Sequence, residues 1–102
     1  MPRPLGITSL RILAAIRDGS AYGLDLVART GMPSGTVYPT LGRLKNSRLV
    51  VASWEDQRIA EREGRPRRRY YALTAEGAQA LAAGVTTVRR VARDLDPRAR
   101  EA

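Results

Sequence analysis

Apolar residues recur at helical spacing at the start of the chain and predict two short helices. Residues 8–18 place most of their apolar side chains on one side of a helix, which Gly19 can end in a left-handed conformation. Ser20 can cap a second helix, residues 20–29, which Gly31 ends. The expected inward positions of the first helix are Leu10, Leu13, Ala14 and Ile16, and those of the second are Leu24, Val27 and Ala28.

A third helix is predicted over residues 35–46, with Ser34 as its N-cap. The inward positions are Val37, Leu41 and Leu44. The tight connection at residues 30–33 contains both glycine and proline, which favour a turn. Two short helices joined by such a turn form a helix-turn-helix pattern.

The periodicity then changes to that of two β-strands. Residues 49–56 are rich in valine and include a tryptophan, and residues 67–73 include two adjacent tyrosines. The segment between them is polar and contains glycine and proline, so we expect a loop there. The two strands predict a β-hairpin wing.

The last predicted helix covers residues 75–95, capped by Thr74 and ended before Pro97. Its apolar positions alternate spacings of three and four, which is a coiled-coil pattern. These positions are Ala78, Leu81, Val85, Val88, Ala92 and Leu95. The face could instead cover the first helix, but residues 1–74 already supply a core for that helix, so we favour a homodimer.

The order of elements predicts an α+β fold. Residues 1–74 are expected to form a winged helix-turn-helix (α-α-α-β-β) DNA-binding domain, and residues 75–97 a C-terminal dimerisation helix. A flexible tail is expected over residues 98–102.

Composition narrows the choice of partner. The 102 residues suffice for one small domain. The 18 Lys and Arg residues against 10 Asp and Glu residues give a net charge of +8, which favours binding of a polyanion.

Histidine and cysteine are absent, so the usual zinc ligands and thiol nucleophiles are excluded. We therefore expect no metal, no cofactor and no enzymatic activity. No apolar stretch is long enough to span a bilayer, which predicts no membrane association and a cytoplasmic protein.

Carboxylates give no alternative catalytic site. They lie on the predicted strand and loop among arginines, where a solvated role is the simpler interpretation. These residues are Glu55, Asp56, Glu61 and Glu63.

In a helix-turn-helix the N-terminal end of the second helix meets base edges and phosphates. Here we expect Thr36 and Tyr38 to contact bases or phosphates, Ser34 to cap the helix and donate to phosphate, and Arg43 to clamp a phosphate. Gly35 and Pro39 complete this outer face. The alternative is that Ser34 only caps, Tyr38 packs beside the wing and Arg43 is solvated.

The wing supplies a second candidate contact, because residues 58–69 hold six arginines and two glutamates. The Arg-Pro-Arg run behind Gly64 is similar to minor-groove hooks, which makes Arg65, Arg67 and Arg69 the candidates. The alternative is a hydrophilic tip whose arginines keep the protein soluble or pair with Glu61 and Glu63.

Trp54 is the single tryptophan. We expect it to pack within its strand. The alternative is that it stacks a planar effector at the dimer groove.

Several motifs together resemble the PadR family of winged-helix transcriptional regulators. They are AYG at 21–23, SGTVYP at 34–39, GRPR at 64–67 and YYALTAEG at 70–77, with Leu41, Arg43, Leu44, Leu49, Val50 and Trp54 between them. The similarity extends over roughly residues 8–82, and the short C-terminal part resembles compact members with one C-terminal helix.

The resemblance implies a homodimeric cytosolic repressor that binds a pseudo-palindromic operator in double-stranded DNA and is often released by a small-molecule effector. The alternative is a winged-helix adaptor whose basic surface binds an acidic protein or RNA.

Overall fold

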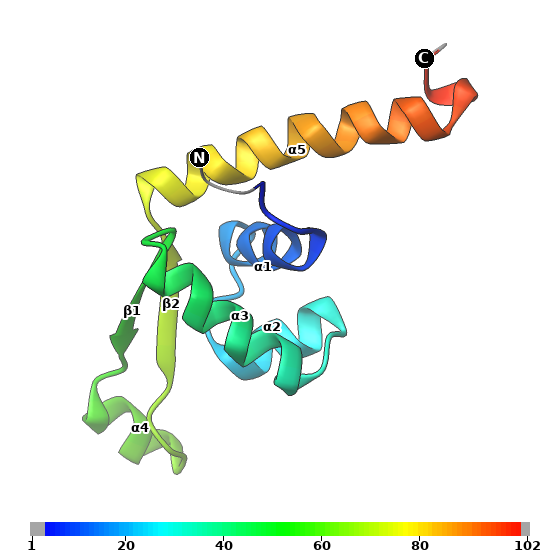
Figure 1. The fold of residues 1–102 in the computed structure, drawn as a ribbon. Coiled ribbons are helices and arrows are strands. Elements are labelled where there is room, and N and C mark those ends of the chain that lie inside the picture. The colour runs from blue at the N-terminus through cyan, green and yellow to red at the C-terminus, as the bar shows by residue number, and fades with distance from the viewer. Residues whose placement is uncertain (1–3, 101–102) are drawn as a thin grey trace.

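The computed structural model describes residues 4–100 (Figure 1). The elements follow in the order α1 (Ile7–Arg17), α2 (Gly23–Thr30), α3 (Ser34–Asn46), β1 (Val50–Trp54), α4 (Gln57–Glu63), β2 (Arg69–Leu73), α5 (Ala75–Leu95) and a 3-10 turn, η1 (Pro97–Arg100). The predicted helix-turn-helix, hairpin and C-terminal helix are confirmed. Regular structure continues in η1 into the segment expected to be a flexible tail, whose last two residues lie outside the described range.

The start of α2 differs from the prediction. Ser20 does not cap this helix: it is buried, and its hydroxyl has no hydrogen-bond partner among the described residues. The chain instead stays extended through Tyr22, which forms a β-bridge with Tyr70, while the Tyr71 amide donates to the Ala21 carbonyl. This isolated bridge keeps the chain extended and delays the start of the helix until Gly23.

The expected inward face of α2 is also wrong in part. Leu26 is fully buried, whereas Leu24 is 69% exposed and Ala28 is exposed as well. Only Val27 packs against the core as predicted. The buried stripe begins at Gly23, against which Tyr38 packs, and a glycine carries no hydrophobic signal in a sequence pattern.

Helix α3 presents the predicted inward face, because Val37, Leu41 and Leu44 are all buried. Its N-cap is Pro33, so Ser34 is the first helical residue rather than the cap, and no side chain caps this end. The amides of Thr36 and Val37 bond to the Pro33 carbonyl instead.

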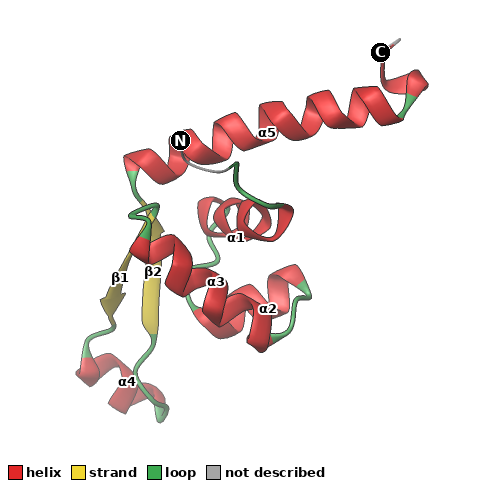
Figure 2. Ribbon diagram, in the orientation of Figure 1, coloured by secondary structure: helices red, strands yellow, loops and turns green. Residues whose placement is uncertain are grey.

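Strands β1 and β2 pair in antiparallel register, with Trp54 opposite Arg69. The segment between them is not only a loop, since α4 forms at the far end of the hairpin (Figure 2). Asp56 caps α4 by accepting from the Arg58 amide, and Gly64 ends it in the left-handed region at φ 67°. Most residues of α4 are good helix formers: glutamine, arginine, alanine and glutamate. Helix propensity in the sequence therefore already favoured a helix between the strands.

The core surrounds α1, whose Ile12 and Leu13 are fully buried, and it is completed by residues of α2, α3, β1 and α5 (Figure 1). Helix α5 crosses over α1 so closely that a methyl group at Gly84 would overlap the side chain of Leu10. Beyond this crossing, α5 extends away from the other elements. With α5 included, the longest dimension of the described chain is 54 Å. Among the described residues, no helix has both the length and the apolar composition needed to cross a membrane.

The first turn of α5 is fixed to the connection between α3 and β1. Thr74 caps the helix as predicted, accepting from the Gly77 amide at 2.9 Å, and its hydroxyl donates to the Arg48 carbonyl at 2.7 Å. Gly77 lies directly against the carbonyl oxygen of Leu49, where a side chain would collide with backbone. The position of α5 therefore depends on a glycine.

We expect Gly77→Ala to lower the free energy of unfolding by about 1–3 kcal/mol, because the new methyl group displaces α5 from Leu49. Gly42→Ala is the matched control, since Gly42 is exposed within α3 and an added methyl group there would have no neighbour within 4 Å in the described chain beyond its own stretch of helix. This control should gain about 0.5–1 kcal/mol from helix propensity. Urea unfolding of both variants measures the difference, and equal stabilities would contradict the close approach.

Candidate nucleic-acid interface

The N-terminal end of α3 presents a mainly exposed surface. Ser34, Gly35 and Pro39 are exposed, Tyr38 is 45% exposed, and Thr36 is half-buried. The surface has small side chains next to the positive end of the helix dipole, which favours close approach of an anionic group.

Pro39 lies inside α3 and removes one backbone donor there. The carbonyl that loses its partner is that of Gly35, four residues earlier. Because Gly35 and Pro39 are both exposed, water can satisfy this carbonyl, and the cost of the proline is reduced.

A short chain of hydrogen bonds orders the outer side of α3. The Thr40 hydroxyl donates to the Thr36 carbonyl at 2.7 Å, and the Arg43 guanidinium donates to the Thr40 hydroxyl at 3.0 Å. Arg43 is exposed, so its remaining N–H groups can donate to an anion. The hydrogen bond to Thr40 orients the guanidinium.

A buried carboxylate organises the wing. Glu55 is 5% exposed. Its two carboxylate oxygens accept hydrogen bonds from the two terminal nitrogens of Arg65, at 2.6 and 2.9 Å. The Tyr70 hydroxyl donates to the same carboxylate at 2.9 Å and the Arg68 amide at 3.3 Å. The backbone of Glu55 adds two bonds, since its amide donates to the Arg68 carbonyl and its carbonyl accepts from Arg67 Nε.

These donors change the acidity of Glu55. The hydrogen bonds from Arg65, aided by those from Tyr70 and Arg68, lower its pKa from 4.5 to about 2 despite desolvation, which acts in the opposite direction. The ionised form therefore stabilises the fold fully above pH 4.5, and this contribution is lost as the pH falls toward 2.

The expectation of a solvated Glu55 is thus wrong. The carboxylate lies between β1 and the arginine run, where it satisfies donors that would otherwise be buried without partners. Arg65, expected to point into a DNA groove, has both terminal nitrogens on Glu55. The acidic partner of Arg65 is therefore Glu55 rather than Glu61 or Glu63.

Trp54 does not pack inside the protein as expected, since it is 57% exposed at the end of β1. The guanidinium carbons of Arg67 and Arg69 each lie 5.5 Å from the centroid of its ring, within the range of cation–π attraction. The indole therefore holds two arginines of the wing in fixed positions while leaving their outer N–H groups available.

A further set of contacts, absent from the sequence analysis, connects the wing to α2. The Arg68 guanidinium lies 4.1 Å from the centroid of the Tyr22 ring, and Tyr22 meets Tyr70 edge to face at 5.9 Å. Tyr70 in turn bonds to Glu55. The wing and the helix-turn-helix therefore form one connected unit.

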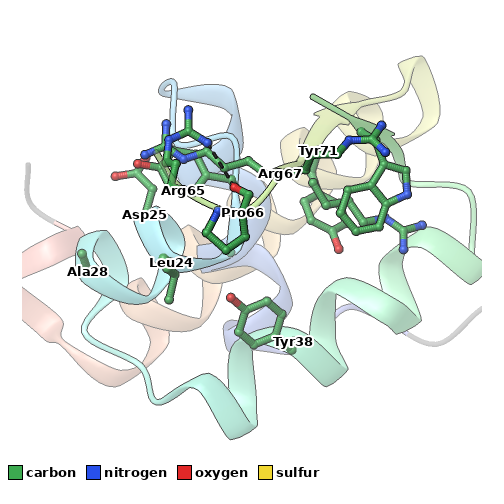
Figure 3. A pocket seen from close by; sticks show the side chains of 13 residues that line it. Leu24, Asp25, Ala28, Tyr38, Arg65, Pro66, Arg67 and Tyr71 are labelled. Carbon is green, nitrogen blue, oxygen red and sulfur yellow. Dashed lines mark hydrogen bonds between the residues drawn. The ribbon is translucent and has the colours of Figure 1, made fainter. Parts of the chain in front are cut away.

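The two candidate contact regions open onto one cleft between α2, α3 and the wing. Figure 3 shows the Tyr38 side chain pointing from α3 toward Leu24 of α2 and Pro66 of the wing. Arg67 and Arg69 line the same cleft. Of the sequence-predicted residues, Tyr38 of the helix and three arginines of the wing line this cleft, namely Arg65, Arg67 and Arg69. The other predicted residues of α3 lie outside it: Ser34, Gly35, Thr36, Pro39 and Arg43.

The predicted seam of α5 divides into two parts. Leu81 is buried and Val85 packs against the core, so this part covers α1. Val88 is exposed beyond the crossing, and Leu95 is 79% exposed. Val91, which was not a predicted seam position, is an exposed apolar residue of the same part of α5. The remaining seam positions, Ala78 and Ala92, are exposed as well.

Comparison with known proteins gives a family match. The family model described as the transcriptional regulator PadR-like family matches residues 12–83. No curated protein matches the chain.

Solved structures share the fold. A PadR family transcription regulator from Clostridium difficile has a TM-score of 0.78 at 21% identity, covering 88% of this chain and 95% of that one. A PadR-like transcription factor from Bacteroides fragilis has a TM-score of 0.74 at 25% identity, covering 88% and 87%. Bordetella bronchiseptica BpsR, whose DNA binding is regulated by 6-hydroxynicotinic acid, has a TM-score of 0.71 at 23% identity, covering 92% and 67%. The winged helix-turn-helix prediction is confirmed.

We expect Glu55→Gln to loosen the wing, because a neutral amide cannot pair with both nitrogens of Arg65 and leaves donors unsatisfied. Limited trypsin digestion should then cleave after Arg67 and Arg68 several times faster than in the unchanged protein. Glu63→Gln is the control: it removes the same charge from an exposed residue of α4. Equal cleavage rates in the two variants would contradict a role for Glu55 in fixing the wing.

Proposed function

The chain belongs to the transcriptional regulator PadR-like family, and from this premise we propose that it is a homodimeric repressor that binds a pseudo-palindromic operator in duplex DNA. The family is one of transcriptional regulators rather than of enzymes. The resemblance found in the sequence is confirmed by the match over residues 12–83.

One observation carries the DNA-binding proposal: Tyr38 of α3 and the arginines at 67 and 69 line a single cleft. The end of α3 can therefore enter a major groove while the wing meets the adjacent backbone or minor groove. The net charge of +8 provides the sequence-independent attraction.

We assign the contacts as follows. Thr36 and Tyr38 contact bases or phosphates, with Gly35 and Pro39 allowing close approach, and Ser34 and Arg43 bind phosphate. In the wing, Arg67 and Arg69 are the contacts, and Arg65 positions the loop through Glu55.

Dimerisation is proposed through the exposed seam of α5. Val88, Val91 and Leu95 form an apolar stripe that the rest of the described chain does not cover. A second copy of α5 would bury it by coiled-coil packing and place two recognition helices on one duplex.

Repression requires only that the bound dimer overlap a promoter. We also propose that a small-molecule effector releases the operator. BpsR, which shares the fold, has its DNA binding regulated by 6-hydroxynicotinic acid.

Selection of bound duplexes from a random pool tests the proposal. We expect a pseudo-palindromic motif with half-sites separated by about one helical turn. Absence of any enriched motif, together with binding of an acidic protein or RNA that depends on Thr36 and Tyr38, would favour the adaptor alternative.

Arg43→Ala should weaken binding by a similar factor for every duplex tested and reduce the salt dependence by about one counterion per protomer, because it removes a phosphate contact. Fluorescence anisotropy at several salt concentrations measures both quantities. The control is Arg98→Ala, which removes the same charge from an exposed residue near the end of the described chain. Equal effects of both substitutions would mean that only net charge matters.

Val88→Asp should convert the dimer to a monomer at micromolar concentration, because a carboxylate would be buried in the seam without a partner. Sedimentation velocity measures the change. Thr86→Asp, on the opposite side of α5 and exposed, should leave the dimer intact. A dimer in both variants would place the interface elsewhere.

A further inference from the structure

Strand β1 has a free edge. Strand β2 is paired on both sides, since β1 lies along one side and the segment of Ala21 and Tyr22 bonds to it on the other. Strand β1 is paired only with β2, and no other element of the described chain continues the sheet beyond it (Figure 1). The outer side of β1 is therefore open to a further strand.

The register shows which backbone groups of this edge point outward. Just beyond the two strands, the Glu55 amide donates to the carbonyl of Arg68, the residue opposite it. Residues that bond to the neighbouring strand alternate along an antiparallel pair. The amides and carbonyls of Ala52 and Trp54 therefore face away from β2, and within the described chain they have no hydrogen-bond partner.

The composition of β1 does not protect this edge. Edge strands usually carry a lysine, a proline or a bulge that discourages further pairing. The sequence of β1 is VVASW, which contains neither a charge nor a proline. Val51 and Trp54 are also more than half exposed. Such a strand favours pairing with another extended chain.

A groove of about 790 Å³ runs beside this edge. Lys45 of α3, Val51 and Ala52 of β1, and Glu76 of α5 contribute to its walls. None of its residues lines the cleft between α2, α3 and the wing, and none is a proposed DNA contact. An occupant of the groove therefore leaves the proposed DNA surface free.

The charges of the groove favour an acidic occupant. Lys45 and Arg48 are exposed, and neither forms an ion pair within the described chain. Glu76 is the one carboxylate of the lining. Arg48 has a φ of 60°, a conformation that favours glycine, so the guanidinium is held there at a conformational cost.

Two other occupants fit less well. A second copy of the chain brings a net charge of +8 to an edge that is itself basic, and like charges oppose that contact. Duplex DNA carries the right charge, but it has no peptide backbone to pair with the free amides and carbonyls of β1. An extended acidic peptide supplies both properties.

We propose that the free edge of β1 binds an extended acidic segment of a partner protein, which joins the sheet as a further strand. The backbone of the segment pairs with Ala52 and Trp54. Helix α3 packs on the face of β1 that carries Val50. Because side chains alternate between the faces of a strand, carboxylates of the segment lie on this side, near Lys45, and its apolar side chains lie on the side of Val51.

Backbone amide resonances of the DNA-free full chain test the pairing. The chain is titrated with the acetylated and amidated peptide EVEVE, and with KVKVK, which has the same alternation and the opposite charge. EVEVE should shift the Ala52 amide proton downfield in a saturable manner and slow its hydrogen exchange, because this amide gains an acceptor. KVKVK should bind more weakly by roughly tenfold or more.

One pair of variants tests the backbone contact. Ala52→Pro removes the outward amide at an edge position, where a strand tolerates proline, and should weaken EVEVE binding by roughly tenfold. Ala52→Ser is the control, because it keeps the amide. Binding is followed at the Trp54 amide, and thermal unfolding verifies the fold of both variants.

A second pair tests the charge. Arg48→Gly removes the guanidinium and relieves the left-handed backbone, so it should stabilise the fold while weakening EVEVE binding by roughly twofold to fivefold. Arg98→Ala is the control, because it removes the same charge from an exposed residue outside the groove. Equal weakening by both would leave only net charge as the cause and would contradict a role for Arg48.

The remaining outcomes are distinct. Equal binding of the two peptides, or equal binding of EVEVE to the proline and serine variants, would overturn the proposal. Protection of the Ala52 amide that rises with protein concentration alone would assign the edge to a second copy, and a shift with duplex DNA that competes with EVEVE would assign it to nucleic acid. Specific EVEVE binding by a chain that selects no operator would support this proposal while contradicting the proposed function.

Discussion

The wing depends on the burial of one negative charge. Glu55 accepts hydrogen bonds from two side chains and one amide of the segment that follows α4, and its own backbone bonds to two of the adjacent arginines. A run of five residues with four arginines would otherwise repel itself and remain extended in water. Glu55 converts that run into a defined surface, since its carboxylate and backbone together bind Arg65, Arg67 and Arg68.

The same interaction transmits order toward the helix-turn-helix. Tyr70 bonds to Glu55 and packs edge to face on Tyr22, which immediately precedes α2. The separation between α3 and the wing is therefore set by side-chain contacts as well as by the backbone. Such pre-organisation reduces the entropy lost when a surface of this kind meets a partner.

The fold could be predicted from the sequence where a local signal was strong. Helical periodicity, the Thr74 cap and the stop at Pro97 gave α5 correctly, because each depends on residues a few positions apart. The pairing of Glu55 with Arg65 could not be predicted, since ten residues and a helix separate them and several carboxylates were equivalent in sequence. The prediction of the buried face of α2 was wrong because a buried glycine, Gly23, does not contribute to a hydrophobic pattern.

The length of helix α5 connects the proposed dimer contact to the position of the recognition helix. The helix packs on α1 in its first part and carries the exposed apolar residues of the proposed dimer seam near its C-terminal end. A rotation of α5 at the dimer contact would therefore move the whole winged helix-turn-helix. The 21 residues of α5 span about 30 Å, and at that radius a change of about 5° in the crossing angle would shift each recognition helix by about 2–3 Å. The angle at which two copies cross would thus set the register between half-sites, and substitutions far from any DNA contact could retune operator spacing.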